Sequence, residues 1–176
     1  MAIVYLSLGS NIGNRRKNIE AAIIELEKNN INPLILSSLY ETEPVGPKQR
    51  MFYNMSGKFN TKLQPNELLK QVKRIERILG RTKTFKWGPR VIDIDILFYG
   101  KQIIQMKNLI IPHKEIVHRL FVLIPMKEIA PYFIHPVYKK TVSTLLKLLI
   151  SNLISNRCIF CKTKNLKNKN IEINNC

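Results

Sequence analysis

The segment VIDIDILFYG, at residues 91–100, constrains the fold of this chain more than any other feature. Its apolar residues alternate with two aspartates, and a period of two predicts a strand with Asp93 and Asp95 on one face and the neighbouring isoleucines on the other. At about 3.3 Å per residue, the Cα atoms of the two aspartates would lie roughly 6 to 7 Å apart. Because carboxylates this close repel each other, the pair favours one or two hard cations; exposed carboxylates without a ligand are the alternative.

A basic loop, RTKTFKWGPR at residues 81–90, directly precedes this strand. Its cations are Arg81, Lys83, Lys86 and Arg90. Magnesium is usually held by one or two carboxylates together with substrate phosphates, and Arg or Lys side chains can neutralise charge during phosphoryl transfer. Acids and cations together predict an enzyme that transfers phosphate from magnesium-bound ATP, whereas the loop alone could be a solvated surface. Trp87, the single tryptophan, could stack on a ligand or anchor the loop by packing.

The apolar periodicity predicts the element order β-α-β-β-α-β. Strands are expected at 2–8, 33–40, 52–61 and 91–100, and helices at 15–29 and 64–80. An irregular loop is expected at 41–50, a returning hairpin strand at 101–105, a short helix running through 113–130, and a last helix at 141–154. This order predicts the α+β class, with a ferredoxin-like sandwich in which helices pack on a mainly antiparallel sheet.

One domain is expected from the length of 176 residues and the hydrophobic content of 45%. It would span residues 1–155, because from about residue 156 the chain turns polar and rich in lysine, which predicts a basic, mobile C-terminal tail at 156–176. The start MAIVYLSLGSN lacks a secretory signal pattern, and no stretch reaches the ~20 apolar residues of a membrane span. A cytoplasmic protein without a membrane partner is therefore expected.

The formal net charge of +17 fits nucleic acid, an anionic membrane surface, nucleotide phosphates, or a compositional bias toward lysine. The rival reading is an RNA-binding module of ferredoxin-like topology. The chain lacks the [KR]G[FY][GA]FV element of such modules, and the paired aspartates would repel phosphates without a cation. No nucleic-acid partner is therefore expected.

Several motifs in order along the chain resemble one family. They are LGSNIGN, YETEPVGP, FYN, GRTKTFKWGPRVIDIDILFYG, IPH and RLFVLIPMKEIAP. From about Ala2 to Pro136 the chain resembles the 6-hydroxymethyl-7,8-dihydropterin pyrophosphokinases of folate biosynthesis. The resemblance implies a ferredoxin-like fold and transfer of the β,γ-diphosphate of ATP to the hydroxymethyl group of 6-hydroxymethyl-7,8-dihydropterin, with AMP as the other product. A monomer is expected, and a pterin-binding protein without catalysis is the alternative.

The same resemblance implies a role for individual residues. Asp93 and Asp95 would bind two Mg²⁺ ions and, with Arg81 and Arg90, form the catalytic group. The ATP-binding residues would be Lys73, Glu76, Lys83, Lys86, Trp87, His113 and Arg119. The residues that bind the pterin would be Thr42, Val45, Phe52, Asn54 and Phe121.

Overall fold

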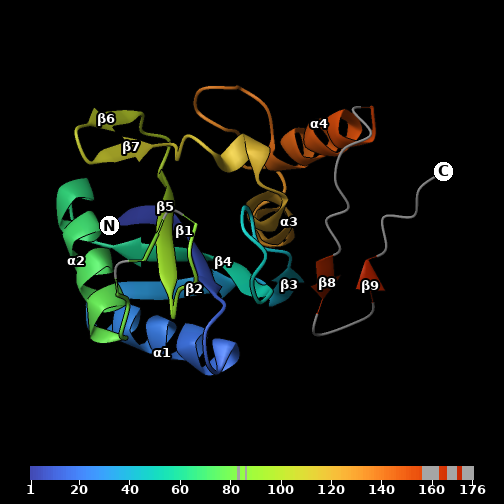
Figure 1. Cartoon of the computed structure of the whole chain (residues 1–176). Helices are drawn as coiled ribbons and strands as arrows, with labels where there is room; N and C mark the ends of the chain where they lie inside the picture. The colour runs from blue at the N-terminus through green and yellow to red at the C-terminus, as the bar shows by residue number, and fades with distance from the viewer. Residues whose placement is uncertain (83, 86, 156–162, 166–169, 172–176) are drawn as a thin grey trace.

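The computed structural model describes the chain except residues 83, 86, 156–162, 166–169 and 172–176 (Figure 1). Lys83, Lys86 and most of the predicted tail therefore lie outside the described residues. Among the helices of the described part, none combines the length and apolar character needed to cross a membrane.

In the described part of the chain, seven strands form an antiparallel sheet (Figure 1). They are β1 (Ala2–Ser10), β2 (Ile31–Leu36), β3 (Tyr40–Thr42), β4 (Phe52–Thr61), β5 (Asp93–Tyr99), β8 (Thr163–Asn165) and β9 (Asn170–Ile171). β1 lies between β4 and β5, and β2 and β3 pair with successive parts of β4. In this register Gly9 lies between Asp93 of β5 and Asn54 of β4, so residues far apart in the sequence form one row across the sheet.

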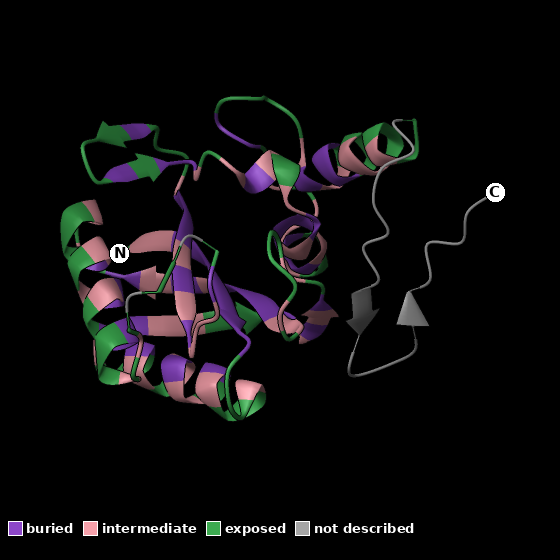
Figure 2. Cartoon of the chain, viewed as in Figure 1, coloured by how far each residue is buried: buried purple, intermediate pink, exposed green. Residues whose placement is uncertain are grey.

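Two helices cover one face of the sheet and carry their buried residues on the side that faces it (Figure 2). Helix α1 (Arg15–Lys28) is capped by Asn14, whose side chain accepts a hydrogen bond from the Lys17 N–H at 3.1 Å. Helix α2 (Pro65–Ile78) starts with a proline and is followed by Gly80 in the left-handed region, with φ +90°. Val4, Leu6 and Leu8 of β1 pack against these helices. The predicted first and second helices are confirmed.

The opposite face of the sheet is covered over part of its length. There Tyr5 and Phe98 pack with helices α3 (Leu120–Ile129) and α4 (Val142–Ser155) in a second apolar core. Farther along β1, the residues on this face are Ser7 and Gly9, which line a hollow instead. The change from large apolar to small polar residues along one strand face thus leaves room for a site.

Three sequence predictions differ from the structure. The strand predicted at 33–40 is interrupted between β2 and β3, because the Ser38 N–H donates to the Glu128 carboxylate rather than to a strand. The helix predicted within 113–130 is a 3₁₀ turn (Ile116–His118) followed by α3. Strand β6 (Ile104–Met106) pairs with β7 (Leu109–Ile111) and not with the preceding strand.

The backbone of β8 pairs with β3, and β9 pairs with β8, within the range predicted to be a tail. The α+β class and the mainly antiparallel sheet are confirmed. The order of the sheet brings β5, the start of β4 and the N-terminal end of α3 to the same region, where the candidate site lies.

Candidate functional site

The two aspartates of β5 lie on one face of the sheet, as the alternation predicted. Ile94 and Ile96 are buried on the other face, whereas the side chains of Asp93 and Asp95 are 18% and 28% exposed. The opposite residues on β1 are Gly9 and Ser7, which are too small to cover the acids. Both carboxylates therefore remain accessible to a ligand while much of the surrounding water is excluded.

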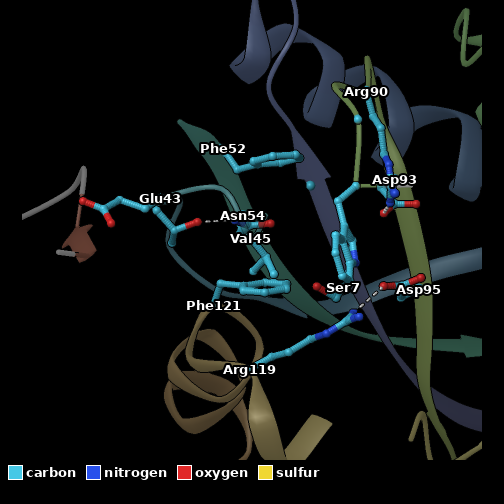
Figure 3. Close-up of a pocket in the computed structure, with 14 residues that line it drawn as sticks. Ser7, Glu43, Val45, Phe52, Asn54, Arg90, Asp93, Asp95, Arg119 and Phe121 are labelled. Carbon is cyan, nitrogen blue, oxygen red and sulfur yellow. Dashed lines mark hydrogen bonds and ion pairs between the residues drawn. The ribbon is translucent and has the colours of Figure 1, made fainter. Parts of the chain in front are cut away.

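Three arginines, two from the 81–90 loop and one from the start of α3, reach these acids. One Asp93 oxygen lies 2.6 Å from an Arg81 guanidinium nitrogen, and the other accepts from Arg90. Arg119, at the start of α3, lies 3.5 Å from Asp95 (Figure 3). Although burial alone raises the pKa of Asp93, the Arg81 and Arg90 charges hold that pKa below its ordinary value. The predicted catalytic group Arg81, Arg90, Asp93 and Asp95 is thus assembled in one place.

A buried carboxylate, Glu76, contacts both Arg81 and the backbone of β5. Glu76 of α2 is 2% exposed and accepts from the Ile94 N–H at 2.8 Å, from Lys73 at 3.0 Å and from Arg81. The carboxylate therefore orients Arg81 and fixes β5 next to its acids. Glu76 thus lies beside the backbone of β5 and is not part of the lining of either hollow described below.

The first hollow, here called the aromatic hollow, has a ring on each side. Figure 3 shows the rings of Phe52 from β4 and Phe121 from α3 facing each other across it. On its floor, the Asn54 amide donates to the Thr42 hydroxyl at 2.7 Å. Its lining comprises Ser7, Gly9, Thr42, Glu43, Val45, Phe52, Asn54, Trp87, Gly88, Arg90, Asp93, Asp95, Arg119 and Phe121.

Gly9 is required on the floor of the aromatic hollow for a steric reason. A Cβ atom built at Gly9 would lie 2.7 Å from the Asn54 side-chain oxygen, which is closer than non-bonded atoms approach. Because Gly9 has no side chain, the Asn54 side chain can occupy this place next to β1 and line the hollow.

The second hollow, here called the lysine hollow, lies on the other side of Asp95. Its lining comprises Leu69, Lys73, Ile94, Asp95, Ile96, Lys107, Asn108, Leu109, Ile110, His113 and Lys114. Three lysines give it positive charge, and burial lowers the pKa of His113, which favours the neutral form of its ring. Asp95 lines both hollows, so ligands bound in the two would meet at this carboxylate.

Asn11, which follows β1, joins the two loops that border the aromatic hollow. Its side-chain amide donates to Gln49 at 2.9 Å and to the Arg50 carbonyl at 3.2 Å, and its oxygen accepts the Arg90 N–H at 2.7 Å. Gln49 in turn donates to the Trp87 carbonyl at 2.7 Å. The position of Arg90 therefore depends on the same contacts that hold the 41–50 loop.

The structure divides the predicted ATP-binding residues between the two hollows. Lys73 and His113 line the lysine hollow, whereas Trp87 and Arg119 line the aromatic hollow. The indole of Trp87 packs on Gly46, where an added Cβ would lie 3.0 Å from the ring, so this residue anchors its loop to the neighbouring one. Lys83 and Lys86 lie outside the described residues. All five predicted pterin-binding residues line the aromatic hollow.

Sequence reasoning missed several residues of both hollows. Ser7 and Gly9 could have been found from the period of two along β1, since they share the face of Tyr5. Lys107 and Lys114 flank the LIIPH segment, but nothing local assigns them to a ligand. Asn11 could be found only from the contacts that its loop makes in space.

Comparisons with known proteins support one family. A model of the family described as 7,8-dihydro-6-hydroxymethylpterin-pyrophosphokinase (HPPK) matches residues 5–131. The 2-amino-4-hydroxy-6-hydroxymethyldihydropteridine pyrophosphokinase of Aquifex aeolicus is 45% identical over 141 residues, which cover 80% of this chain and 88% of that protein. The folic acid synthesis protein fol1 of Pneumocystis carinii is 43% identical over 150 residues, but the match spans only 20% of its length.

Among solved structures, the HPPK-DHPS protein of Plasmodium falciparum superposes with a TM-score of 0.78 at 19% identity. The match covers 93% of this chain and 47% of that one. At this identity the likeness shows the fold, and the predicted ferredoxin-like α+β sandwich is confirmed.

Proposed function

Because the chain belongs to the 7,8-dihydro-6-hydroxymethylpterin-pyrophosphokinase family, we propose that it transfers the β,γ-diphosphate of ATP to the hydroxymethyl group of 6-hydroxymethyl-7,8-dihydropterin. The single observation that carries this proposal is that Asp95 lines two hollows of different chemistry. One hollow suits a flat uncharged ring and the other suits a polyanion. Their meeting point is where a group would pass from one ligand to the other.

The aromatic hollow would hold the pterin. Phe52 and Phe121 would stack on its two faces, which gains contact energy and fixes the plane of the ring together. Asn54, held by its hydrogen bond to Thr42, would bind the polar edge of the ring. The side of the hollow that contains Asp93 and Asp95 would receive the hydroxymethyl group.

The lysine hollow would hold ATP. Lys73, Lys107 and Lys114 offer charges to the phosphates, and the His113 ring lines the same hollow. The apolar part of the lining could accept the base, and it comprises Leu69, Ile94, Ile96, Leu109 and Ile110. This arrangement would bring the phosphates to Asp95.

The donor set at the acid pair fits magnesium. Oxygen atoms of Asp93 and Asp95 share one strand face, and the described residues hold no cluster of three or more His, Cys, Asp or Glu side chains that would form a full protein cage. Magnesium prefers such a partial site, because substrate phosphates and water complete its coordination. When held by Asp93 and Asp95, the two ions expected for the family would neutralise the negative charge of the phosphates.

The chain's own residues would do the rest by orientation and charge. The hydroxymethyl oxygen attacks the β-phosphorus, a new O–P bond forms, the bond between the α,β-bridging oxygen and the β-phosphorus breaks, AMP departs and the hydroxyl proton is released. Arg81 and Arg90, which reach Asp93 in the free protein, would donate to the transferred phosphates. The loops joined by Asn11 would limit water that competes with the pterin.

The proposal is tested by incubating the protein with ATP, magnesium and 6-hydroxymethyl-7,8-dihydropterin and separating the nucleotides. AMP and the pterin diphosphate should accumulate in equal amounts, and AMP should be absent without the pterin. Formation of ADP, or of no product, would overturn the proposed reaction. Arg90→Ala should slow turnover about a hundredfold, with the exposed Arg16→Ala as the matched control.

A further inference from the structure

A charged contact joins helix α3 to the bend between β2 and β3, some distance from the acid pair. The Glu128 carboxylate, on the last turn of α3, accepts from the Ser38 N–H at 2.9 and 3.0 Å and from the Ser38 hydroxyl at 2.9 Å. It also accepts from the Tyr40 hydroxyl at 2.9 Å. Ser38 and Tyr40 are 5% and 4% exposed, whereas Glu128 lies on the exposed side of α3, so three donors from buried residues hold one carboxylate at a partly buried contact.

This contact is unusual for a helix end. A carboxylate on the last turn of a helix faces the negative end of the helix dipole, which disfavours an anion there. Burial first, and then the hydrogen bond to Glu128, raise the pKa of Tyr40, so its hydroxyl remains a donor. The hydrogen bonds from Ser38 and Tyr40 therefore stabilise the Glu128 carboxylate at a helix end that would otherwise disfavour a negative charge.

The two elements that this contact joins, α3 and β3, also contribute residues to the lining of the aromatic hollow. On α3, Phe121 lies seven residues before Glu128, two helical turns away and on the same face. On β3, Tyr40 and Thr42 share a face, and their partners across the ladder are Asn54 and Phe52. One carboxylate thus connects the helix that carries one ring with β3, whose partner strand β4 carries the other ring and the amide.

We propose that Glu128 is a positioning residue for the ring that binds in the aromatic hollow: its carboxylate fixes α3 against β3 and so sets the separation of Phe121 from the Phe52 and Asn54 wall. Apolar packing also holds α3 to the sheet, but it is less directional than hydrogen bonds to a carboxylate. The hydrogen bonds to Glu128 fix the helix along and across the strand. The identity of the ring as a pterin rests on the proposed function.

The test compares Glu128→Ala, Tyr40→Phe and wild type by calorimetry with two ligands, the pterin and α,β-methylene-ATP. Glu128→Ala should weaken pterin binding about tenfold, and Tyr40→Phe, which removes one of the donors, about threefold. Nucleotide affinity should stay within about twofold for both. Glu25→Gln is the matched control, because Glu25 is a helical carboxylate paired at 2.8 Å with Lys28, remote from both hollows.

Equal loss of affinity for both ligands, or unchanged pterin affinity in Glu128→Ala, would overturn the proposal. If Glu128→Ala does not fold, the pterin and nucleotide affinities of Tyr40→Phe decide it alone. Amide hydrogen exchange without ligand separates this inference from the proposed function. Faster exchange at residues 40–42 and 119–123 in the variants would support the positioning role even if wild type bound no pterin; unchanged exchange in that case would overturn it.

Discussion

The two hollows differ in how their walls are made. The aromatic hollow is built from strand residues and one helix end, and its polar groups, such as Asn54 and Thr42, are buried and hydrogen-bonded to each other. The lysine hollow takes its charge from side chains near a short hairpin, including Lys107 and Lys114. The difference implies that one ligand is chosen by shape and fixed hydrogen bonds, and the other by charge. Substitutions and solution conditions should therefore change the affinity for one ligand without changing the affinity for the other.

The largest effect is expected where the hollows meet. Asp95→Asn keeps the shape of the side chain but removes the charge that both hollows share, so turnover should fall on the order of a thousandfold. The pterin affinity should change little, because the rings and the Asn54 amide remain. Steady-state rates and calorimetry on the same samples measure both quantities, with Glu25→Gln as the control for loss of a carboxylate elsewhere. Turnover within twofold of wild type would contradict the role of Asp95.

A smaller effect confined to the aromatic hollow is expected from Gly9→Ala. The new methyl group would displace the Asn54 oxygen that now lies 2.7 Å from its position, and the pterin affinity should fall about tenfold while nucleotide affinity is retained. Gly100→Ala is a useful control. Its φ of +53° makes alanine strained, but no atom within 4 Å would meet the added Cβ, so it should lower stability without changing either affinity. Equal weakening of both ligands by Gly9→Ala would contradict the separation of the hollows.

The contrast between local and distant contacts also explains what the sequence could predict. The strand, the acid pair on one face and the basic loop were predicted because period, charge and turn residues are local properties of the chain. The interruption between β2 and β3 was missed because its cause, Glu128, lies ninety residues away. The contact of Glu76 with the Ile94 N–H was also missed, because helical periodicity gives a buried face without showing which strand group the carboxylate will meet.

A several-fold effect confined to the lysine hollow is expected from salt. Raising sodium chloride from about 0.05 M to about 0.5 M should weaken nucleotide binding about fivefold, because screening reduces the attraction of the lysines for phosphates. Pterin affinity should change less than about twofold. Lys107→Ala should reduce the salt dependence, and Lys17→Ala on the exposed side of α1 should leave it unchanged. Pterin binding that weakens as much as nucleotide binding would show that charge governs both hollows.

The smallest effect, on stability alone, is expected from His135, which lines neither hollow. His135, between α3 and α4, is buried, and burial lowers its pKa to about 4; its ring nitrogen accepts from the Val137 and Tyr138 N–H groups at 3.2 and 3.3 Å. The folded protein therefore favours the neutral ring. The resulting stability is present above the ordinary pKa of 6.5 and is lost as the pH falls toward 4.

In thermal unfolding, the stability difference between wild type and His135→Gln, on the order of a few degrees in Tm, should narrow over this interval. Neither ligand affinity should change at pH 7, and a constant difference in Tm from pH 7 to 4 would contradict the assignment.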